Sequence, residues 1–380
     1  MSQEIRKKIK ASKRVVIKLG SQVLFDQKGK PDKKIFNQLA QTCARLIQQG
    51  KKIALVSSGA IASGIARLGE KKIPKTMPEK QAIASLGQPI LMQYYQKAFL
   101  PYKIPVGQVL LTHEDFSSRA RYLHSKNTLE TLLKMGIIPI INENDAVAVE
   151  EIQFGDNDQL ASLVAVMLEA DLLVLLSVIK GFCDSDPLEN PQAKVIPIIR
   201  HLDQQIYHCL GEGKTELGKG GMESKLRASE IAASAGIPTF IGSGKDPEVL
   251  EKLFEGKILG SLILPEKKKL PSFKHWLLFA GKPRGKIQVD AGAVQALVER
   301  KKSLLPSGVV EVKGRFEAGE LVEVIDPQGK EIARGLVNYS SSDLEKIKGH
   351  KTDQIEKILG RKDYDEVIHR DHLVLTEAKE

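Results

Sequence analysis

The chain has 380 residues, of which 42% are hydrophobic and 27% charged, the composition of an ordinary soluble globular protein that is long enough for two domains. Its longest apolar run, LLVLLSVI at 172–179, is too short to span a bilayer, and the basic N-terminus lacks the apolar segment of a signal peptide. The formal charge of +10 is weak evidence for an anionic ligand and weaker evidence for RNA, because aromatic residues, which stack on bases, make up only 5%.

Strand-like and helix-like segments alternate from the start of the chain. RVVIKLG at 14–20 and KIALVSS at 52–58 predict strands, and between them lies a predicted helix that ends at Gly50. Further strands are predicted at 106–112, 136–142, 172–177 and 237–243, and further helices around 80–100, 120–135, 157–168 and 222–235. Because the strands are apolar throughout, the alternation predicts an α/β fold with a mostly parallel sheet sandwiched by helices. Ligands of such sheets bind at the carboxyl ends of the strands.

The stretch INENDAVAVEEIQFGDNDQLASLVA at 141–165 gathers short acids and amides where a buried strand ends and again where a helix begins. Turn and cap chemistry explains one or two of them, whereas two clusters indicate a site for a small polar ligand. Asp156 and Asp158 could orient a lysine or hold an ammonium-bearing substrate, and one of them could only cap the helix. Capping is the stronger interpretation for Asn157. Asp145, directly after the buried strand, needs a partner.

Two lysines are placed to bind phosphate. Lys18 closes the first predicted strand, where its charge is costly unless the ammonium emerges at the end of the sheet and meets an anion or reaches solvent. Lys225 lies in the first turn of a predicted helix, where a cation is unfavourable unless an anion compensates. Gly220 and Gly221 let a ligand approach that helix closely, although a flexible glycine loop with a surface lysine is the alternative. Phosphoryl transfer needs cationic groups on the oxygens of the moving phosphoryl group, together with Mg²⁺ and a positioned acceptor, and the two lysines fit the first of these requirements.

The pattern changes near residue 265. Residues 266–283 are rich in Pro and Lys, and short β-like runs split by Gly and Pro follow them. DPQGK at 326–330 lies between two alternating runs and predicts a hairpin. We therefore expect one domain over 1–265, a linker over 266–283 and a small β-rich domain over 284–375.

Several segments, in order and spacing, resemble the glutamate 5-kinase family, whose members have the amino-acid kinase fold: VVIKLGSQVL, ALVSSGAIASG, INENDAVAVEEIQFGDNDQLA, KGFCDSDP and GKGGMESKLRAS. Three later segments resemble a PUA domain: GKIQVDAGAVQAL, SLLPSGVVEVKGRFEAGE and IARGLVNYSSSDL. The resemblance covers nearly the whole chain. It implies ATP-dependent phosphorylation of the γ-carboxylate of L-glutamate to L-glutamyl 5-phosphate, the first step of proline biosynthesis, with ATP and with Mg²⁺ held through the ATP phosphates. It further implies a homo-oligomer, a dimer or tetramer.

The resemblance also assigns roles to individual residues. Lys18 and Lys225 match the two lysines that stabilise the transferring phosphoryl group, Asp158 matches an acid essential for substrate binding, and Asp156 matches an acid that organises the lysines. These four are the candidate catalytic residues. The implied glutamate site consists of Ser58, Asp145, Asn157 and Asp158. The implied ATP site consists of Lys18, Ser177, Val178, Lys219, Gly220, Gly221, Met222, Glu223, Ser224 and Lys225.

The chain departs from the commoner family pattern at three places that bear on nucleotide contacts. Ser177-Val178 stand where many relatives have Thr-Asp, Lys219 stands where Thr is frequent, and YLHSKNT at 122–128 replaces YLNARNT. Two rival functions remain: a kinase of the same fold that acts on acetylglutamate or aspartate, and a protein whose main task is RNA binding through the PUA-like domain.

The cysteines bear on the compartment. Cys43, Cys183 and Cys209 are widely spaced and form no CxxC pair. They predict reduced cysteines of a cytoplasmic protein.

Overall fold

The computed structural model describes residues 3–26, 29–69, 74, 76–147, 157–185, 190, 192–202, 206, 221–265, 274, 277–278 and 283–376. The chain divides into two compact units at Leu270 and Pro271. Each unit has its own sheet, and no strand is shared between the two sheets of the described chain. Within the described residues, no helix combines the length and the apolar character needed to cross a membrane.

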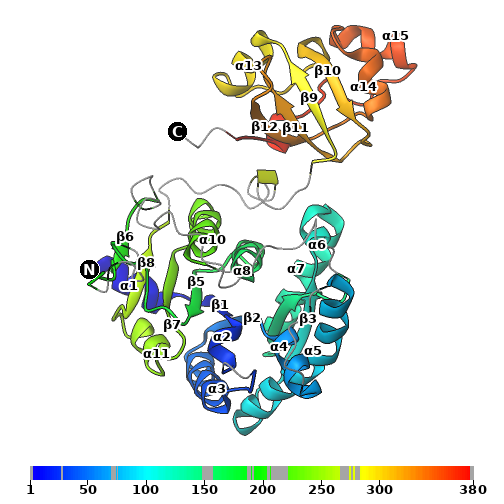
Figure 1. The fold of residues 1–380 in the computed structure, drawn as a ribbon. Coiled ribbons are helices and arrows are strands. Elements are labelled where there is room, and N and C mark those ends of the chain that lie inside the picture. The colour runs from blue at the N-terminus through cyan, green and yellow to red at the C-terminus, as the bar shows by residue number, and fades with distance from the viewer. Residues whose placement is uncertain are drawn as a thin grey trace. The chain divides into compact units, whose positions relative to one another are not determined.

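The first unit contains an eight-stranded sheet in the order β3-β4-β2-β1-β5-β7-β8-β6 (Figure 1). Its strands are β1 (Arg14–Leu19), β2 (Lys52–Ser57), β3 (Val106–Leu111), β4 (Ile138–Glu143), β5 (Leu172–Ser177), β6 (Ile198–Ile199), β7 (Thr239–Ser243) and β8 (Gly260–Ile263). All neighbouring strands are parallel except β7 and β8, which are antiparallel. The mostly parallel sheet predicted from the sequence is therefore confirmed.

Helices cover both faces of this sheet, as Figure 1 shows. They are α1 (Gln3–Ala11), α2 (Ser21–Leu24), α3 (Lys33–Gln48), α4 (Ala60–Leu68), α5 (Met77–Phe99), α6 (His113–Ser117), α7 (Arg119–Lys134), α8 (Asn157–Met167), α10 (Met222–Ser234) and α11 (Val249–Phe254), and a 3₁₀ turn at Leu100–Tyr102 follows α5. Seven short elements have no counterpart among the predicted segments, because each is too short to show a clear period of apolar residues: α1, α2, α4, α6, α11, β6 and β8.

The central strand β1 shows how the two faces differ. Its neighbours are β2 and β5, and all of its residues from Val15 to Leu19 are buried. Val15, Ile17 and Leu19 pack into the core formed with α3, α5 and α11. Because side chains alternate along a strand, Lys18 points to the opposite face, where α8 packs against β1. A Cβ on Gly20 would lie 3.9 Å from Lys18 Nζ, so the ammonium lies beside the turn that ends β1.

The loop after β2 and the start of α4 are fixed by two glycines. Gly59, the N-cap of α4, has φ 117°, in the left-handed region that favours glycine. A Cβ on Gly87 of α5 would lie 1.8 Å from the carbonyl oxygen of Ala60, so the backbones of α4 and α5 are in direct contact. Any side chain at Gly87 would push α5 away from the first residue of α4 and thus from Ser58, which precedes it.

The second unit is built around a five-stranded sheet in the order β10-β9-β11-β12-β13. Its strands are β9 (Gly285–Val289), β10 (Val309–Gly314), β11 (Leu321–Ile325), β12 (Glu331–Leu336) and β13 (Leu373–Leu375). Its helices are α13 (Ala291–Val298), α14 (Ser341–Ile347) and α15 (Ile355–Leu359), with 3₁₀ turns at Pro306–Gly308, Thr352–Gln354 and Arg370–His372. A separate core, which includes Ile287, Val324 and Leu344, fills this unit.

The predicted hairpin of the second unit is confirmed. Strands β11 and β12 pair antiparallel across the turn that begins at Asp326. The Asp326 carboxylate accepts hydrogen bonds from the backbone N–H groups of Gln328 and Lys330, and Gly329 has φ 86°. The turn is thus specified by the Asp and the Gly of the DPQGK pattern.

Separate cores and separate sheets predict that the first unit folds alone. A chain that ends near Lys267 should show one cooperative unfolding transition and a circular dichroism spectrum rich in helix, because each core is filled by residues of its own unit. Thermal unfolding of the truncated chain, compared with the full chain, makes the test. A truncated chain that aggregates or lacks a cooperative transition would show that the second unit is needed for folding.

Candidate active site

Three charged side chains meet in the interior at the carboxyl end of β1. Lys18 Nζ lies 2.6 Å from Asp158 Oδ1, and Lys225 Nζ lies 2.9 Å from Asp158 Oδ2. The exposed fractions are 0% for Asp158, 4% for Lys18 and 3% for Lys225, so all three groups are removed from water. Asp158 comes from the first turn of α8 and Lys225 from the first turn of α10, and these two helices pack against each other.

The electrostatics of this cluster favour an anionic ligand. Two ammonium groups share one carboxylate in a buried place. The start of α10 adds the partial positive charge and the free N–H groups of a helix N-terminus. A phosphate group has several oxygens that can accept charge-assisted hydrogen bonds from both ammonium groups.

A chain of hydrogen-bonded side chains lies beside the cluster. Asn157 Nδ2 donates to Ser58 Oγ at 2.7 Å and to Asn142 Oδ1 at 2.9 Å. Asn142 Nδ2 donates to Gln88 Oε1 at 3.0 Å, and Gln88 Nε2 donates to Gln108 Oε1 at 3.2 Å. Asn157 is therefore not simply a helix cap, because its amide joins the loop after β2 to the end of β4.

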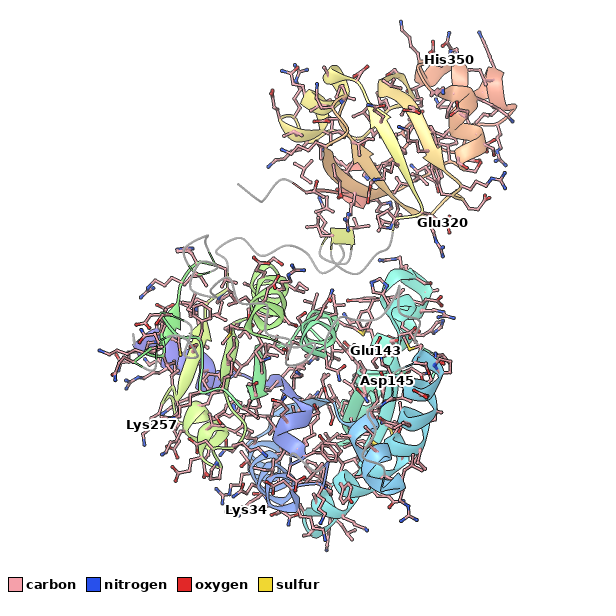
Figure 2. The ribbon with its side chains drawn as sticks, viewed as in Figure 1. Lys34, Glu143, Asp145, Lys257, Glu320 and His350 are labelled. Atoms are coloured by element: carbon pink, nitrogen blue, oxygen red, sulfur yellow. The ribbon has the colours of Figure 1, made fainter. Side chains whose placement is uncertain are left out.

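Asp145 lies at a small pocket of about 170 Å³ at the end of β4. Burial raises the pKa of its carboxyl group to about 6. The pocket is lined by residues of α4, α5, β3, the end of β4 and the turn after β4, among them Gln88, Gln108, Glu143 and Asp145. Figure 2 labels Glu143 and Asp145 at this end of the sheet. A carboxylate that is held in partial burial would gain from a cationic partner.

The structure brings together some of the predicted site residues. Lys18, Asp158 and Lys225 form one cluster, and Ser58 contacts Asn157. Asp158 itself contacts both lysines, which is the arrangement that the family resemblance assigns to Asp156. Asp156, Lys219 and Gly220 lie outside the described residues.

The remaining residues of the predicted ATP site surround the start of α10 and the end of β5. Gly221 is the N-cap of α10, followed by Met222, Glu223 and Ser224, and the exposed Glu223 pairs with Arg227. The carbonyl oxygen of Ser177 accepts a hydrogen bond from Gly244 N, and Val178 is 45% exposed. These positions lie at strand and helix ends, where a nucleotide could reach the backbone.

Sequence reasoning missed three members of the hydrogen-bonded chain. Asn142 lies inside the INEND segment, but the pattern gives it no role of its own. Gln108 interrupts the apolar run of β3, which is the signal that could have marked it. Gln88 lies in the middle of α5, where a glutamine is ordinary, and no sequence signal distinguishes it.

Two family models match the chain. The model of the amino acid kinase family matches residues 13–243, and the model of the PUA domain matches residues 285–359. The first match spans every strand of the first sheet except β8, and it includes all three members of the charged cluster.

Curated relatives are similar over almost the full length. The glutamate 5-kinase of Thermus thermophilus is 48% identical over 367 residues, which are 97% of this chain and 98% of that protein. The glutamate 5-kinase of Thermoanaerobacter sp. strain X514 is 46% identical over 97% of this chain and 99% of that protein. The glutamate 5-kinase of Pelobacter propionicus is 45% identical over 99% of this chain and 100% of that protein.

The buried cluster predicts a large effect of removing its anion. Asp158→Asn keeps the size of the side chain but leaves two buried ammonium groups without this carboxylate, so the free energy of unfolding should fall by about 3–5 kcal/mol. Urea unfolding at neutral pH measures this difference.

The control is Glu223→Gln, which removes the anion of an exposed pair with Arg227 and should cost less than about 1 kcal/mol. Equal stability of the two variants would mean that Asp158 does not compensate the lysines in solution.

Proposed function

The chain belongs to the amino acid kinase family and, within it, to the glutamate 5-kinases, and we propose from this premise that it phosphorylates the γ-carboxylate of L-glutamate with ATP. The product is L-glutamyl 5-phosphate, and the reaction opens proline biosynthesis. The observation that carries the proposal is the buried cluster in which Asp158 contacts Lys18 and Lys225.

The transfer needs few chemical groups from the protein. A γ-carboxylate oxygen of glutamate attacks the γ-phosphorus of ATP, an O–P bond forms, and the bond to the bridging oxygen breaks, so ADP leaves with the electron pair. The carboxylate is already ionised at neutral pH, so no general base is required. The ammonium groups of Lys18 and Lys225 neutralise negative charge on the phosphoryl oxygens, and the fixed cluster supplies alignment.

Asp158 supports this role of the lysines. Its two oxygens hold the two ammonium groups on either side of one buried carboxylate before any substrate arrives. The lysines are therefore already ordered when the phosphates bind, and little side-chain entropy is lost at that moment. Asp156 stays a candidate for the same task or for substrate binding.

We propose that Asn157, Asp145 and Ser58 hold the amino acid. Asn157 Oδ1 is buried and has no hydrogen-bond partner among the described residues, so it can accept from the α-ammonium of glutamate. The carboxylate of Asp145 supplies the charge that an ammonium prefers, and Ser58 has a hydroxyl group for the substrate's carboxylate. Acceptors for the ammonium and cations for the phosphoryl group thus lie at the same edge of the sheet.

ATP and Mg²⁺ complete the proposal. The nucleotide would contact Lys18, Ser177, Val178 and the segment from Lys219 to Lys225, with its phosphates at the start of α10. Mg²⁺ usually keeps several waters and binds through substrate phosphates, where it neutralises charge. Among the described residues, no group of three or more His, Cys, Asp or Glu side chains could hold a metal ion. We propose that Mg²⁺ is held through the phosphates of ATP.

Other expectations stay predictions. These are the boundaries 1–265, 266–283 and 284–375, a cytoplasmic location, assembly into a dimer or tetramer, and RNA binding by the PUA unit. Cys43 and Cys183 are free thiols, as a reducing compartment requires, and Cys209 lies outside the described residues.

Turnover with different acceptors tests the function. Transfer of the phosphoryl group from ATP to form ADP and an acyl phosphate, which is trapped with hydroxylamine, should be seen with L-glutamate and be far weaker with aspartate or acetylglutamate. In the same assay Lys225→Ala should lower kcat by about a hundredfold or more, because a transition-state charge contact typically contributes a few kcal/mol.

Lys257→Ala is the control for Lys225, because its ammonium is exposed and pairs at the surface with Glu255 (Figure 2). It should keep the turnover of the unchanged protein. Near-normal turnover of Lys225→Ala would show that this lysine does not act on the phosphoryl group. Faster turnover with acetylglutamate or aspartate than with glutamate would show that glutamate is not the acceptor.

The raised pKa of Asp145 predicts a pH dependence of substrate binding. Below pH 6 its carboxyl group is protonated and cannot attract an ammonium, so KM for glutamate should be about tenfold higher at pH 5 than at pH 7. KM for ATP should change much less.

The stability of the free protein should change with pH in the opposite direction to substrate binding: it should fall as pH rises. Because burial raises the pKa of Asp145 from 3.8 to about 6, the folded state binds the proton more tightly, and stability falls as pH rises through this interval. Asp145→Asn should remove both effects. A KM for glutamate that is constant from pH 5 to 7 would show that the carboxylate of Asp145 does not bind the ammonium group of glutamate.

A further inference from the structure

The side-chain amides beside the cluster form a row in which the NH₂ group of each donates a hydrogen bond to the carbonyl oxygen of the next. Asn157 donates to Asn142, Asn142 donates to Gln88, and Gln88 donates to Gln108. Asn142 is 2% exposed and Gln88 is 7% exposed, so neither has free access to water. In a buried row of amides each member fixes the orientation of the next, because a flip would place two donors or two acceptors against each other.

The direction of this row decides what Asn157 offers to a ligand. Both N–H bonds of Asn157 Nδ2 are used, one by Ser58 Oγ and one by Asn142 Oδ1. Its buried Oδ1 has no partner among the described residues. In this orientation Asn157 presents an acceptor, which binds an ammonium. In the reverse orientation it would present its NH₂ group, which would be unfavourable next to an ammonium.

We propose that Gln88 is a positioning residue for the amino-acid substrate: its Oε1 atom fixes the carboxamide of Asn142 and through it keeps Asn157 Oδ1 turned toward the substrate ammonium. This inference rests on the proposed function for the identity of the ligand. Gln88 makes no contact with the phosphoryl path, so its effect falls on the binding of the amino acid and not on the transfer step.

The backbone beneath Gln88 is held firmly enough for this task. The preceding residue, Gly87, lies against the carbonyl oxygen of Ala60, where a Cβ would be only 1.8 Å away. One N–H of the Gln88 amide is also occupied, because Nε2 donates to Gln108 Oε1 on the edge strand β3. Gln88 is thus fixed at its backbone and at one end of its amide, and its other end is the acceptor for Asn142.

Substitutions that separate the acceptor from the size of the side chain test the proposal. Gln88→Met keeps length and volume without hydrogen bonds, and KM for glutamate should rise about tenfold, while kcat and KM for ATP stay within about twofold. Gln88→Glu keeps the acceptor for Asn142, and at pH 8 its KM for glutamate should lie within about threefold of the unchanged protein. Rescue by Glu but not by Met distinguishes an acceptor from a space-filling group.

The matched control is Gln93→Met, the same chemical change at an exposed position of α5. It should leave both KM values unchanged. The proposal is overturned if Gln88→Met and Gln93→Met have the same KM for glutamate, or if Gln88→Glu is as impaired as Gln88→Met. If Gln88→Met does not fold, Gln108→Ala at the exposed end of the row decides: a smaller rise in KM for glutamate, of about threefold, supports the proposal, and no rise overturns it.

A measurement without substrate keeps this inference separate from the proposed function. Hydrogen exchange of the side-chain NH₂ group of Asn157, followed by NMR, should be about tenfold faster in Gln88→Met than in the unchanged protein, because Asn142 is then free to turn. Equal exchange rates would overturn the positioning role. A protein that shows this change in exchange but does not phosphorylate glutamate would refute the proposed function and leave the positioning of Asn157 established.

Discussion

The structure depends on one carboxylate that holds two buried ammonium groups. Asp158 cannot be ionised in the interior without partners, and neither lysine can be charged there without an anion. The end of β1, the start of α8 and the start of α10 must therefore converge at one point. A parallel sheet offers such a point, because its strands end at a common edge and its helices begin there. The charged cluster can therefore form only in a fold that brings these three chain segments together.

Much of this arrangement could be predicted from the sequence. Lys18 in an apolar strand and Lys225 in the first turn of a helix are both in unfavourable places, and unfavourable charges mark functional sites. The strong apolar runs of β1, β2, β4 and β5 predict strands that are buried on both faces, as in a parallel sheet. The Asp and Gly of the DPQGK turn specified a hairpin by local chemistry alone. These features depend on residues close together in the chain.

The rest depends on contacts between distant segments, which no local pattern records. The sequence does not show that Asp158 reaches both lysines, because helix starts and strand ends are brought together only by the sheet order. Gln88 resembles any helical glutamine until Asn142 and Gln108 are placed around it. The antiparallel β8 and the two-residue β6 owe their strand geometry to neighbours in the sheet and not to their own composition.

The direct backbone contact between α4 and α5 has a mechanical consequence. No side chain separates the two helices at Gly87, so there is no soft layer that could absorb a small displacement of one helix against the other. Helix α5 has 23 residues and is about 34 Å long at 1.5 Å per residue, and its far end continues into the exposed turn at Leu100–Tyr102. Pro89 lies in α5 two residues after Gly87 and has no backbone N–H to donate, so the helix can bend between its outer turns and the part that contacts α4. A displacement of the outer turn is therefore taken up at Pro89 before it reaches Ala60 and the loop that carries Ser58.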